Sequence, residues 1–131
     1  MTKQVSVTAL EIFGKDSRGH VWEWKFGDGR QIGIFFRKKG AHFAHHYHTG
    51  SDPSKNPERF FLIIGRVKVT WWSKVKKKTI QIARAGEEIA IPAMIPHCFD
   101  ALEDCWFLEY RTNHFDPTHP DVVVLPPHRA R

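Results

Sequence analysis

The sequence predicts an all-β protein, a sandwich or barrel built from many short strands. Runs rich in β-branched and aromatic residues recur at near-regular spacing, with Gly, Pro, Asn, Asp and Ser residues between them. No segment combines a sustained helical period with caps at both ends. The chain has 131 residues, 41% of them hydrophobic, so we expect a single domain over residues 1–131 with one core.

The first three strands are predicted from composition and alternation. Residues 5–13 are rich in β-branched residues, and the polar run 14–19 ends them in a turn. Residues 21–26 alternate aromatic with charged side chains, as a half-buried strand does. The Gly-Asp-Gly turn at residues 27–29 then leads into residues 32–36, where three apolar side chains share one face.

The later strands follow the same logic. The apolar run that opens with Glu58 reaches a turn or bulge at Gly65, after which β-branched and basic residues alternate. The lysine-rich segment 74–78 predicts a hairpin tip. The Pro-rich tail, residues 116–131, is expected to be extended. The remaining expected strands cover residues 66–72, 79–83, 89–91, 97–101 and 105–111, with an edge strand at residues 122–125.

Charge, hydropathy and cysteine usage exclude several classes of function. The formal charge is +6, but the one basic cluster lies at the predicted hairpin tip, so we expect no nucleic-acid partner. No apolar run is long enough to span a membrane, and the N-terminus lacks the apolar region of a secretory signal, which favours a cytoplasmic protein. Cys98 and Cys105 have apolar neighbours and are expected to be buried free thiols.

The histidine-rich segment after Gly40 carries the clearest chemical signal. On a strand, His46 and His48 point to the same side, with Cα atoms roughly 6.5 Å apart, so both imidazoles can reach one metal ion. Glu58 opens the next strand and can supply a carboxylate from the same sheet face. His97, after two prolines, is a fourth candidate.

These residues resemble the motifs of the cupin superfamily. The first cupin motif is Gly, five residues, His-x-His, three or four residues, Glu, six residues and Gly. Gly40, His46 and His48 match its first part, and Glu58 and Gly65 match its last part. Nine residues rather than three or four separate the two parts, which is a loop insertion that such a fold tolerates.

The second cupin motif is Gly, five residues, Pro-x-Gly, two residues, His, three residues and Asn. Gly86, Pro92 and His97 match it, whereas Met94 stands at its second Gly and Ala101 at its Asn. The resemblance covers residues 40–101 and implies a double-stranded β-helix, the jelly-roll barrel of the cupins. It also implies that one divalent transition metal binds to His46, His48, Glu58 and His97.

The donor set agrees with this implication. Three neutral imidazoles and a carboxylate suit Fe(II), Mn, Zn, Ni or Co. Four protein ligands leave one or two positions open on a metal that prefers six, and an open position is what a catalytic metal requires.

Asp52 competes with Glu58 for the carboxylate position. Strict motif spacing places Asp52 three residues after His48, whereas Glu58 keeps the spacing to Gly65. Asp52 lies in a Gly-Ser-Asp-Pro-Ser stretch that is typical of a loop, and Glu58 lies on a strand that fixes its direction. We therefore predict Glu58 as the ligand and a place for Asp52 in a lid over the cavity.

Strand parity suggests further residues of the cavity. His42 shares the parity of His46 and His48, and it is the predicted catalytic base if the other histidines hold a metal. Glu109 and Tyr110 are adjacent, so only one of them can face inward. The predicted pocket-lining residues are Phe60, Leu62, Phe99 and Tyr110.

A second and weaker resemblance bears on function. The C-terminal part, from Ala101 to Asp121, is similar to that of small cupins of sugar-nucleotide and polysaccharide biosynthesis, which implies a sugar-type substrate and isomerase or epimerase chemistry. The alternatives are an Fe(II)-dependent dioxygenase and a non-catalytic small-molecule binding or sensing module. We also expect a homodimer, because the tryptophans are more numerous than one small barrel readily buries: Trp22, Trp24, Trp71 and Trp72.

Overall fold

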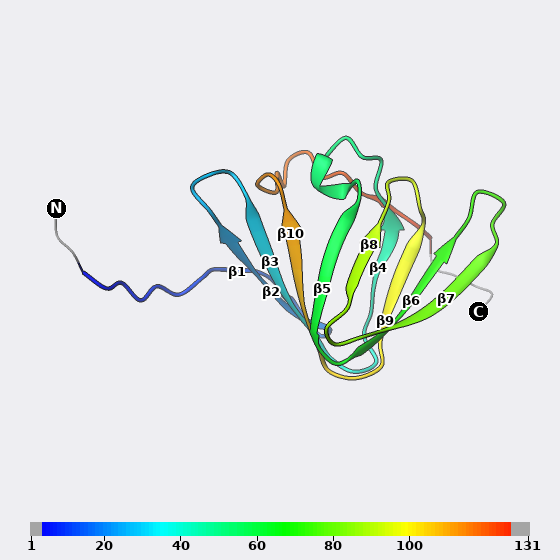
Figure 1. Ribbon diagram of the computed structural model, residues 1–131, viewed down its shortest axis with the longest axis horizontal. Coiled ribbons are helices and arrows are strands. Elements are labelled where there is room, and N and C mark those ends of the chain that lie inside the picture. The colour runs from blue at the N-terminus through cyan, green and yellow to red at the C-terminus, as the bar shows by residue number, and fades with distance from the viewer. Residues whose placement is uncertain (1–3, 127–131) are drawn as a thin grey trace.

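The structure, a computed structural model, describes residues 4–126 as two antiparallel sheets that face each other (Figure 1). One sheet has the strand order β1-β2-β3-β10-β5-β8 and the other the order β11-β4-β9-β6-β7. The strands of the first sheet are β1 (Ile12–Asp16), β2 (Gly19–Lys25), β3 (Gln31–Arg37), β10 (Cys105–Arg111), β5 (Glu58–Ile64) and β8 (Glu88–Ile91). Those of the second are β11 (Val123–Val124), β4 (His42–Tyr47), β9 (His97–Ala101), β6 (Arg66–Trp72) and β7 (Lys78–Arg84).

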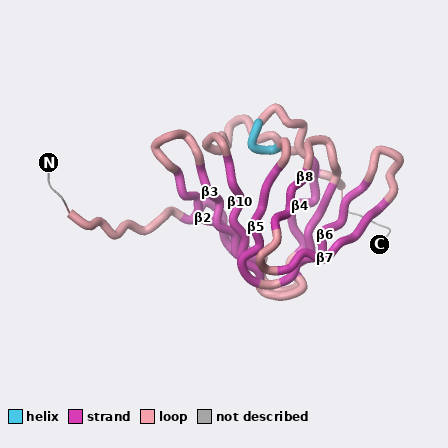
Figure 2. Tube along the Cα trace, viewed as in Figure 1, coloured by secondary structure: helices cyan, strands magenta, loops and turns pink. Residues whose placement is uncertain are grey.

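Helical structure within residues 4–126 is confined to one short 3-10 helix, η1 (Pro53–Lys55), which lies between β4 and β5 (Figure 2). The predicted all-β jelly roll is therefore confirmed. In this part of the chain, no helical segment has the length and hydropathy needed to cross a bilayer.

The first strand differs from its prediction. Residues 4–11 form no strand, and Val5 and Val7 are almost fully exposed. β1 instead begins at Ile12 and includes Gly14, which pairs with Val21 of β2. The β-branched composition was misleading for residues 5–11, because within the described chain no strand lies beside them with which to form a ladder.

A bulge in β4 decides which histidines face the interior. Phe43 pairs with Phe99 of β9, and His46 pairs with His97, so three steps along β4 match two along β9. Ala44 has a φ of 55° at this place, as expected of a bulged residue. The extra residue reverses the alternation of faces between its two sides.

The core lies between the two sheets. Phe60 and Leu62 of β5 are buried, as are Phe99 of β9 and Phe107 of β10. Phe60 meets the rings of Phe99 and Phe107 at centroid distances of 5.6 and 6.2 Å. These side chains alternate along their strands with residues on the outer faces, as the predicted period of two requires.

The aromatic alternation of β2 lies on the outer face of its sheet. Gly19 and Val21 are the buried residues of this strand, while Trp24 is 45% exposed and Trp22 stacks on Trp106 of β10. Trp71, on β6, packs against the core instead. The homodimer stays a prediction. We expect the second copy to contact the apolar outer face around Trp24.

Both cysteines are buried and not bonded to each other, as predicted. The tail runs past β4, where the edge strand β11 pairs Val123 with Tyr47 and Val124 with His46. The predicted edge strand is thus present, although it is shorter than residues 122–125. The last part of the predicted Pro-rich tail, residues 127–131, lies outside the described residues.

The backbone conformation at Met94 is the one that the Gly of the second cupin motif would adopt. Its φ is 67°, in the left-handed region that favours Gly, which is the residue that the motif has at this position. The Met94 N–H donates to the carbonyl of His48 at 2.7 Å. The turn before β9 therefore keeps a glycine-like conformation without a Gly.

Candidate metal centre

Four side chains from three strands and one adjoining loop converge between the sheets. The ligand atoms of His46, His48, Glu58 and His97 all lie within 4.8 Å of one another. His46 is on β4, Glu58 begins β5, His97 begins β9, and His48 directly follows β4. The structure thus brings together the four residues that the sequence predicted as ligands.

Hydrogen bonds fix which nitrogen of two histidines faces the centre. His48 Nδ1 lies 2.5 Å from the carbonyl oxygen of Asp121, and His97 Nδ1 lies 2.8 Å from that of Ile95. Because a carbonyl can only accept, each Nδ1 carries a proton, and each Nε2 is the nitrogen that faces the centre. Such a bond to the outer nitrogen is typical of histidines that bind metal.

The inner nitrogens of His46 and His97 lack partners that would compete with a metal. His46 Nε2 and His97 Nε2 are buried and accept no hydrogen bond from the described residues. Burial, together with the neighbouring His97 and His48, lowers the pKa of His46 to about 3, and burial also lowers the pKa of His97. Both imidazoles are therefore neutral at pH 7 and able to donate a lone pair.

The two carboxylate oxygens of Glu58 have different partners, since one faces the histidines and the other faces a lysine. Its Oε1 lies 3.2 Å from His48 Nε2 and 3.6 Å from His97 Nε2. Its Oε2 accepts a hydrogen bond of 2.7 Å from Lys55 Nζ. Burial opposes ionisation of Glu58, but the hydrogen bond with His48 and the charge of Lys55 hold its pKa well below the ordinary value. The carboxylate is therefore charged and directs one oxygen at the histidines.

Lys55 also contacts a second buried carboxyl group, that of Glu109, beside these four residues. Its Nζ lies 2.6 Å from Glu109 Oε2, and Glu109 faces inward from β10 with 6% exposure. Burial alone would lower the pKa of Lys55, but Glu109 and Glu58 raise it. Burial raises the pKa of Glu109 to about 7. The nine-residue segment between His48 and Glu58, which includes the loop insertion, thus carries a lysine that orients a predicted ligand.

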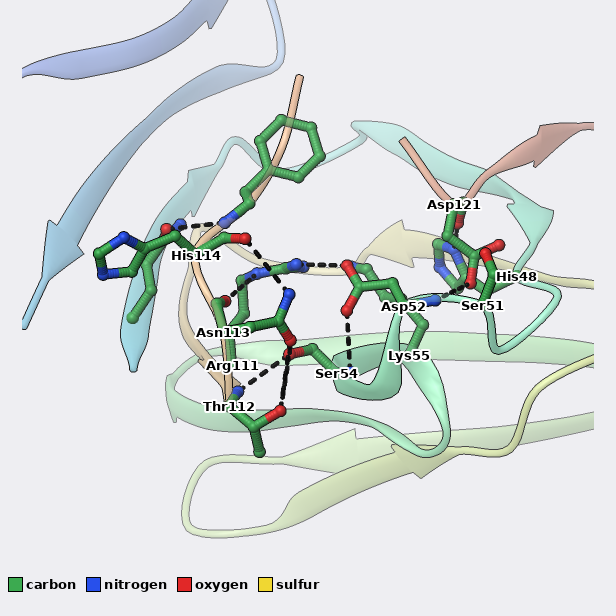
Figure 3. A network of polar contacts seen from close by, with 12 residues as sticks. His48, Ser51, Asp52, Ser54, Lys55, Arg111, Thr112, Asn113, His114 and Asp121 are labelled. Atoms are coloured by element: carbon green, nitrogen blue, oxygen red, sulfur yellow. Dashed lines mark hydrogen bonds and ion pairs between the residues drawn. The ribbon is translucent and has the colours of Figure 1, made fainter. Parts of the chain in front are cut away.

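Two buried residues anchor the insertion from elsewhere in the chain (Figure 3). Arg111 of β10 donates through Nη2 to the Asp52 carboxylate and through Nε to the Asn113 carbonyl. Asp52 also accepts a hydrogen bond from the Ser54 N–H and caps η1. It therefore stabilises the loop insertion and is not part of the metal cluster, the name used here for the group of His46, His48, Glu58 and His97. The structure therefore favours Glu58 over Asp52 at the carboxylate position, as predicted.

Asp121 holds the other side of the insertion. Its carboxylate accepts from the N–H groups of Thr49, Gly50 and Asp52 and from the Thr49 hydroxyl, at 2.8 to 3.1 Å. Burial would raise the pKa of Asp121, but these donors lower it to about 2. Since its backbone oxygen also binds His48, this tail residue links the insertion to the metal cluster.

We expect Asp121→Asn to destabilise the protein by about 1–3 kcal/mol at pH 6, because four donors lose a charged acceptor. A carboxylate with a lowered pKa contributes stability above the unfolded pKa near 3.8 and loses it as pH falls toward 2. The difference from wild type should therefore shrink at pH 3, as measured by urea unfolding. Asp116→Asn, at an exposed aspartate whose pKa is also about 2, is the control and should have a much smaller effect at pH 6. A pH-independent difference for Asp121→Asn would contradict the role of its charge.

Two predicted cavity residues lie elsewhere. The bulge at Ala44 places His42 opposite Asp100 on the outer face, and its Nδ1 lies 2.7 Å from Asp100 Oδ1. Tyr110 is also on an outer face, 38% exposed, with Arg59 over its ring. The placements of His42 and Tyr110 in the cavity are therefore wrong, and Glu109 takes the inward position beside Tyr110.

The predicted aromatic liners are where the sequence placed them. Phe60 and Phe99 line a cavity of about 290 Å³ that also includes His46 and Glu58. Leu62 also points inward, but it is fully buried in the core and is not among the residues that line this cavity, so its predicted place in the pocket wall is wrong. Strand parity predicted these three directions correctly because no bulge lies between Glu58 and Leu62 on β5 or between His97 and Phe99 on β9.

Other residues of the site were missed. Lys55 ends the 3-10 helix η1, Arg111 ends β10 and Asp121 lies in the tail, and the sequence does not show the partner of any of the three. Arg111 shares the inward parity of Phe107 and of Glu109, which the sequence had offered as the alternative to Tyr110, and this parity was the one signal that could have identified Arg111.

The fold is similar to that of several solved structures. One is the capsular polysaccharide assembling protein CapF from Staphylococcus aureus, with a TM-score of 0.76 and 21% identity over 91% of this chain and 32% of that one. Another is a variant of the oxalate decarboxylase OxdC from Bacillus subtilis, with a TM-score of 0.70 and 18% identity over 93% of this chain and 34% of that one.

A third structure comes from work on the Mn(II) centres of Bacillus subtilis oxalate decarboxylase. Its TM-score is 0.64 and its identity 19%, over 88% of this chain and 33% of that one. The chain spans about a third of the length of each of these proteins. No family model and no curated protein matches the sequence. At these identities the likeness shows the fold.

Proposed function

We propose that this chain, whose two sheets form the jelly roll of the cupin superfamily, binds one divalent transition metal and acts on a small oxygenated metabolite. The observation that carries the proposal is the convergence of three imidazoles and one carboxylate in a buried cluster. Two of the histidines have their outer nitrogens engaged by carbonyls, so the inner nitrogens are committed to the centre.

The donors fit such a metal. The inner nitrogens of His46 and His97 are buried without partners, which is costly unless a metal or a bound molecule satisfies them. His46, His48 and His97 would hold the metal through Nε2, and Glu58 through Oε1. Imidazole and carboxylate together suit Mn, Fe, Co, Ni or Zn. The metal would supply Lewis acidity toward a substrate oxygen.

The chain's own residues would bind and enclose the substrate. The 290 Å³ cavity beside His46 and Glu58 has Phe60, Phe99 and Phe107 among its walls, which would exclude water from the reacting group. Lys55 keeps the second oxygen of Glu58 engaged and so fixes the direction of the ligand. This volume suits a small molecule rather than a polymer.

A sugar-type substrate with isomerase or epimerase chemistry is the more specific form of the proposal. It is supported by the weak sequence resemblance of the C-terminal part to cupins of sugar-nucleotide and polysaccharide biosynthesis. The similarity of the fold to that of CapF, a capsular polysaccharide assembling protein, is in keeping with it. Because the predicted base His42 lies on the outer face, any proton transfer would fall to another group of the cavity.

Metal content is the direct test. Protein purified without chelator should contain about one transition metal ion per chain by elemental analysis, and His97→Ala should lose it. His114→Ala is the matched control, since His114 is exposed and belongs to no group of described residues that could hold a metal, and it should keep the metal. Wild-type protein that stays metal-free after incubation with each of the five metals would overturn the proposal, as would His97→Ala protein with undiminished content.

A further inference from the structure

Arg37 is a buried cation that the proposed function does not yet use. It ends β3 and is 9% exposed. Its Nη1 donates to the Phe36 carbonyl at 3.1 Å, and its Nε is buried without a partner among residues 4–126. No carboxylate of the described residues forms an ion pair with it. Burying a guanidinium that has no carboxylate partner is costly, so this position is suited to binding an anion.

The other cations of the interior are already neutralised. Lys55 lies between Glu58 and Glu109, and Arg111 pairs with Asp52. The guanidinium of Arg37 instead lies over two aromatic rings, at 5.5 Å from the centroid of Phe35 and 5.3 Å from that of Phe43. These rings hold the side chain in place and leave its donors available for a bound molecule.

Arg37 and the metal cluster share one cavity. The lining of the 290 Å³ cavity includes Arg37 as well as His46 and Glu58 of the metal cluster. A second space of about 330 Å³ adjoins it and has Arg37, Lys55 and Glu109 in common with it. A separate groove of about 420 Å³ has His97 among its lining residues. It is also lined by Glu87 and Glu88 and, within the described chain, by no Lys or Arg. An anion would therefore be attracted to the side of Arg37.

We propose that Arg37 binds the carboxylate of a small hydroxy acid, such as a sugar acid, whose oxygens face the metal cluster. The inference rests on the proposed function and names the substrate class for the same cavity. A guanidinium matches a carboxylate with parallel N–H donors. Arg18, which also lines the cavity, already pairs with Asp16 at 2.7 Å. One free positive charge balances one carboxylate better than a phosphate ester, which carries close to two charges.

The test compares sugars that differ at one group. D-glucuronate, D-glucose and glucose 6-phosphate are titrated by calorimetry into the metal-loaded full chain. Wild type should prefer glucuronate over both others. Arg37→Gln should weaken glucuronate binding roughly 10- to 100-fold, which is the effect of a lost charge-assisted hydrogen bond, and leave glucose binding unchanged. Arg37→Lys keeps the charge and should recover part of the loss.

Arg59→Gln is the matched control, because Arg59 is an exposed arginine paired with Glu88, and it should bind glucuronate as wild type does. Equal binding of glucuronate and glucose by wild type would overturn the inference. So would an unchanged glucuronate affinity in Arg37→Gln, or stronger binding of glucose 6-phosphate.

Metal content, measured on each sample, separates this inference from the proposed function. If wild type holds no metal, the proposed function fails, and the comparison of glucuronate with glucose in metal-free protein still decides the role of Arg37. If Arg37→Gln protein does not fold, Arg37→Lys decides: weaker glucuronate binding with the preference over glucose kept supports the inference, and wild-type binding of both sugars contradicts it.

Discussion

Glu58→Gln should lower the metal affinity by more than 100-fold, while Asp52→Asn should change it by less than about 10-fold. The reason is that Glu58 Oε1 lies among the histidine nitrogens, whereas both Asp52 oxygens are engaged in the insertion. Loss of a ligand costs more than the 10- to 100-fold expected of a residue that only supports a ligand. Competition with a chromogenic chelator at pH 7.5 would measure both affinities.

Asp52→Asn is itself the control, since it removes the competing carboxylate of the same loop. It should lower stability instead, by about 1–3 kcal/mol, because Arg111 is buried and loses its charged partner. If Asp52→Asn abolished metal binding and Glu58→Gln preserved it, Asp52 would be the ligand and the start of β5 would be wrongly placed.

Lys55→Met should destabilise the metal-free protein by about 3–5 kcal/mol. Glu58 and Glu109 are both buried, and without the ammonium group two carboxyl groups would share the interior with no cation between them. Urea unfolding at pH 7.5 in the presence of a chelator would measure the loss. Metal affinity should also fall, by roughly 10- to 100-fold, because the second oxygen of Glu58 loses its anchor.

The double variant Lys55→Met with Glu109→Gln tests the cause. Removing one of the two carboxylates should recover part of the lost stability, because the effects of contacting charges are not additive. Arg66→Met is the control, since the Arg66–Glu103 pair is exposed and should contribute no more than about 1 kcal/mol. A Lys55→Met protein within 1 kcal/mol of wild type would show that the buried charges are not balanced as described.

The sequence by itself determined the fold class and the four residues of the metal cluster. Period-two alternation predicted most of the strands, and it predicted that His46 and His48 share a face. Glu58 followed from its place at the start of an apolar strand, and His97 from its match, together with Gly86 and Pro92, to the second cupin motif. These features are local, so nearby residues are enough to specify them.

Only the tertiary structure decided the surroundings of the cluster. Nothing local marks the bulge at Ala44, which depends on how β4 pairs with β9 and which places His42 outside. The ion pair of Lys55 with Glu109 joins residues 54 positions apart, and the contact of His48 with Asp121 spans 73. A sequence shows that such charged residues exist, but burial and partnership depend on the packing of the whole chain, which decides how each charge is balanced.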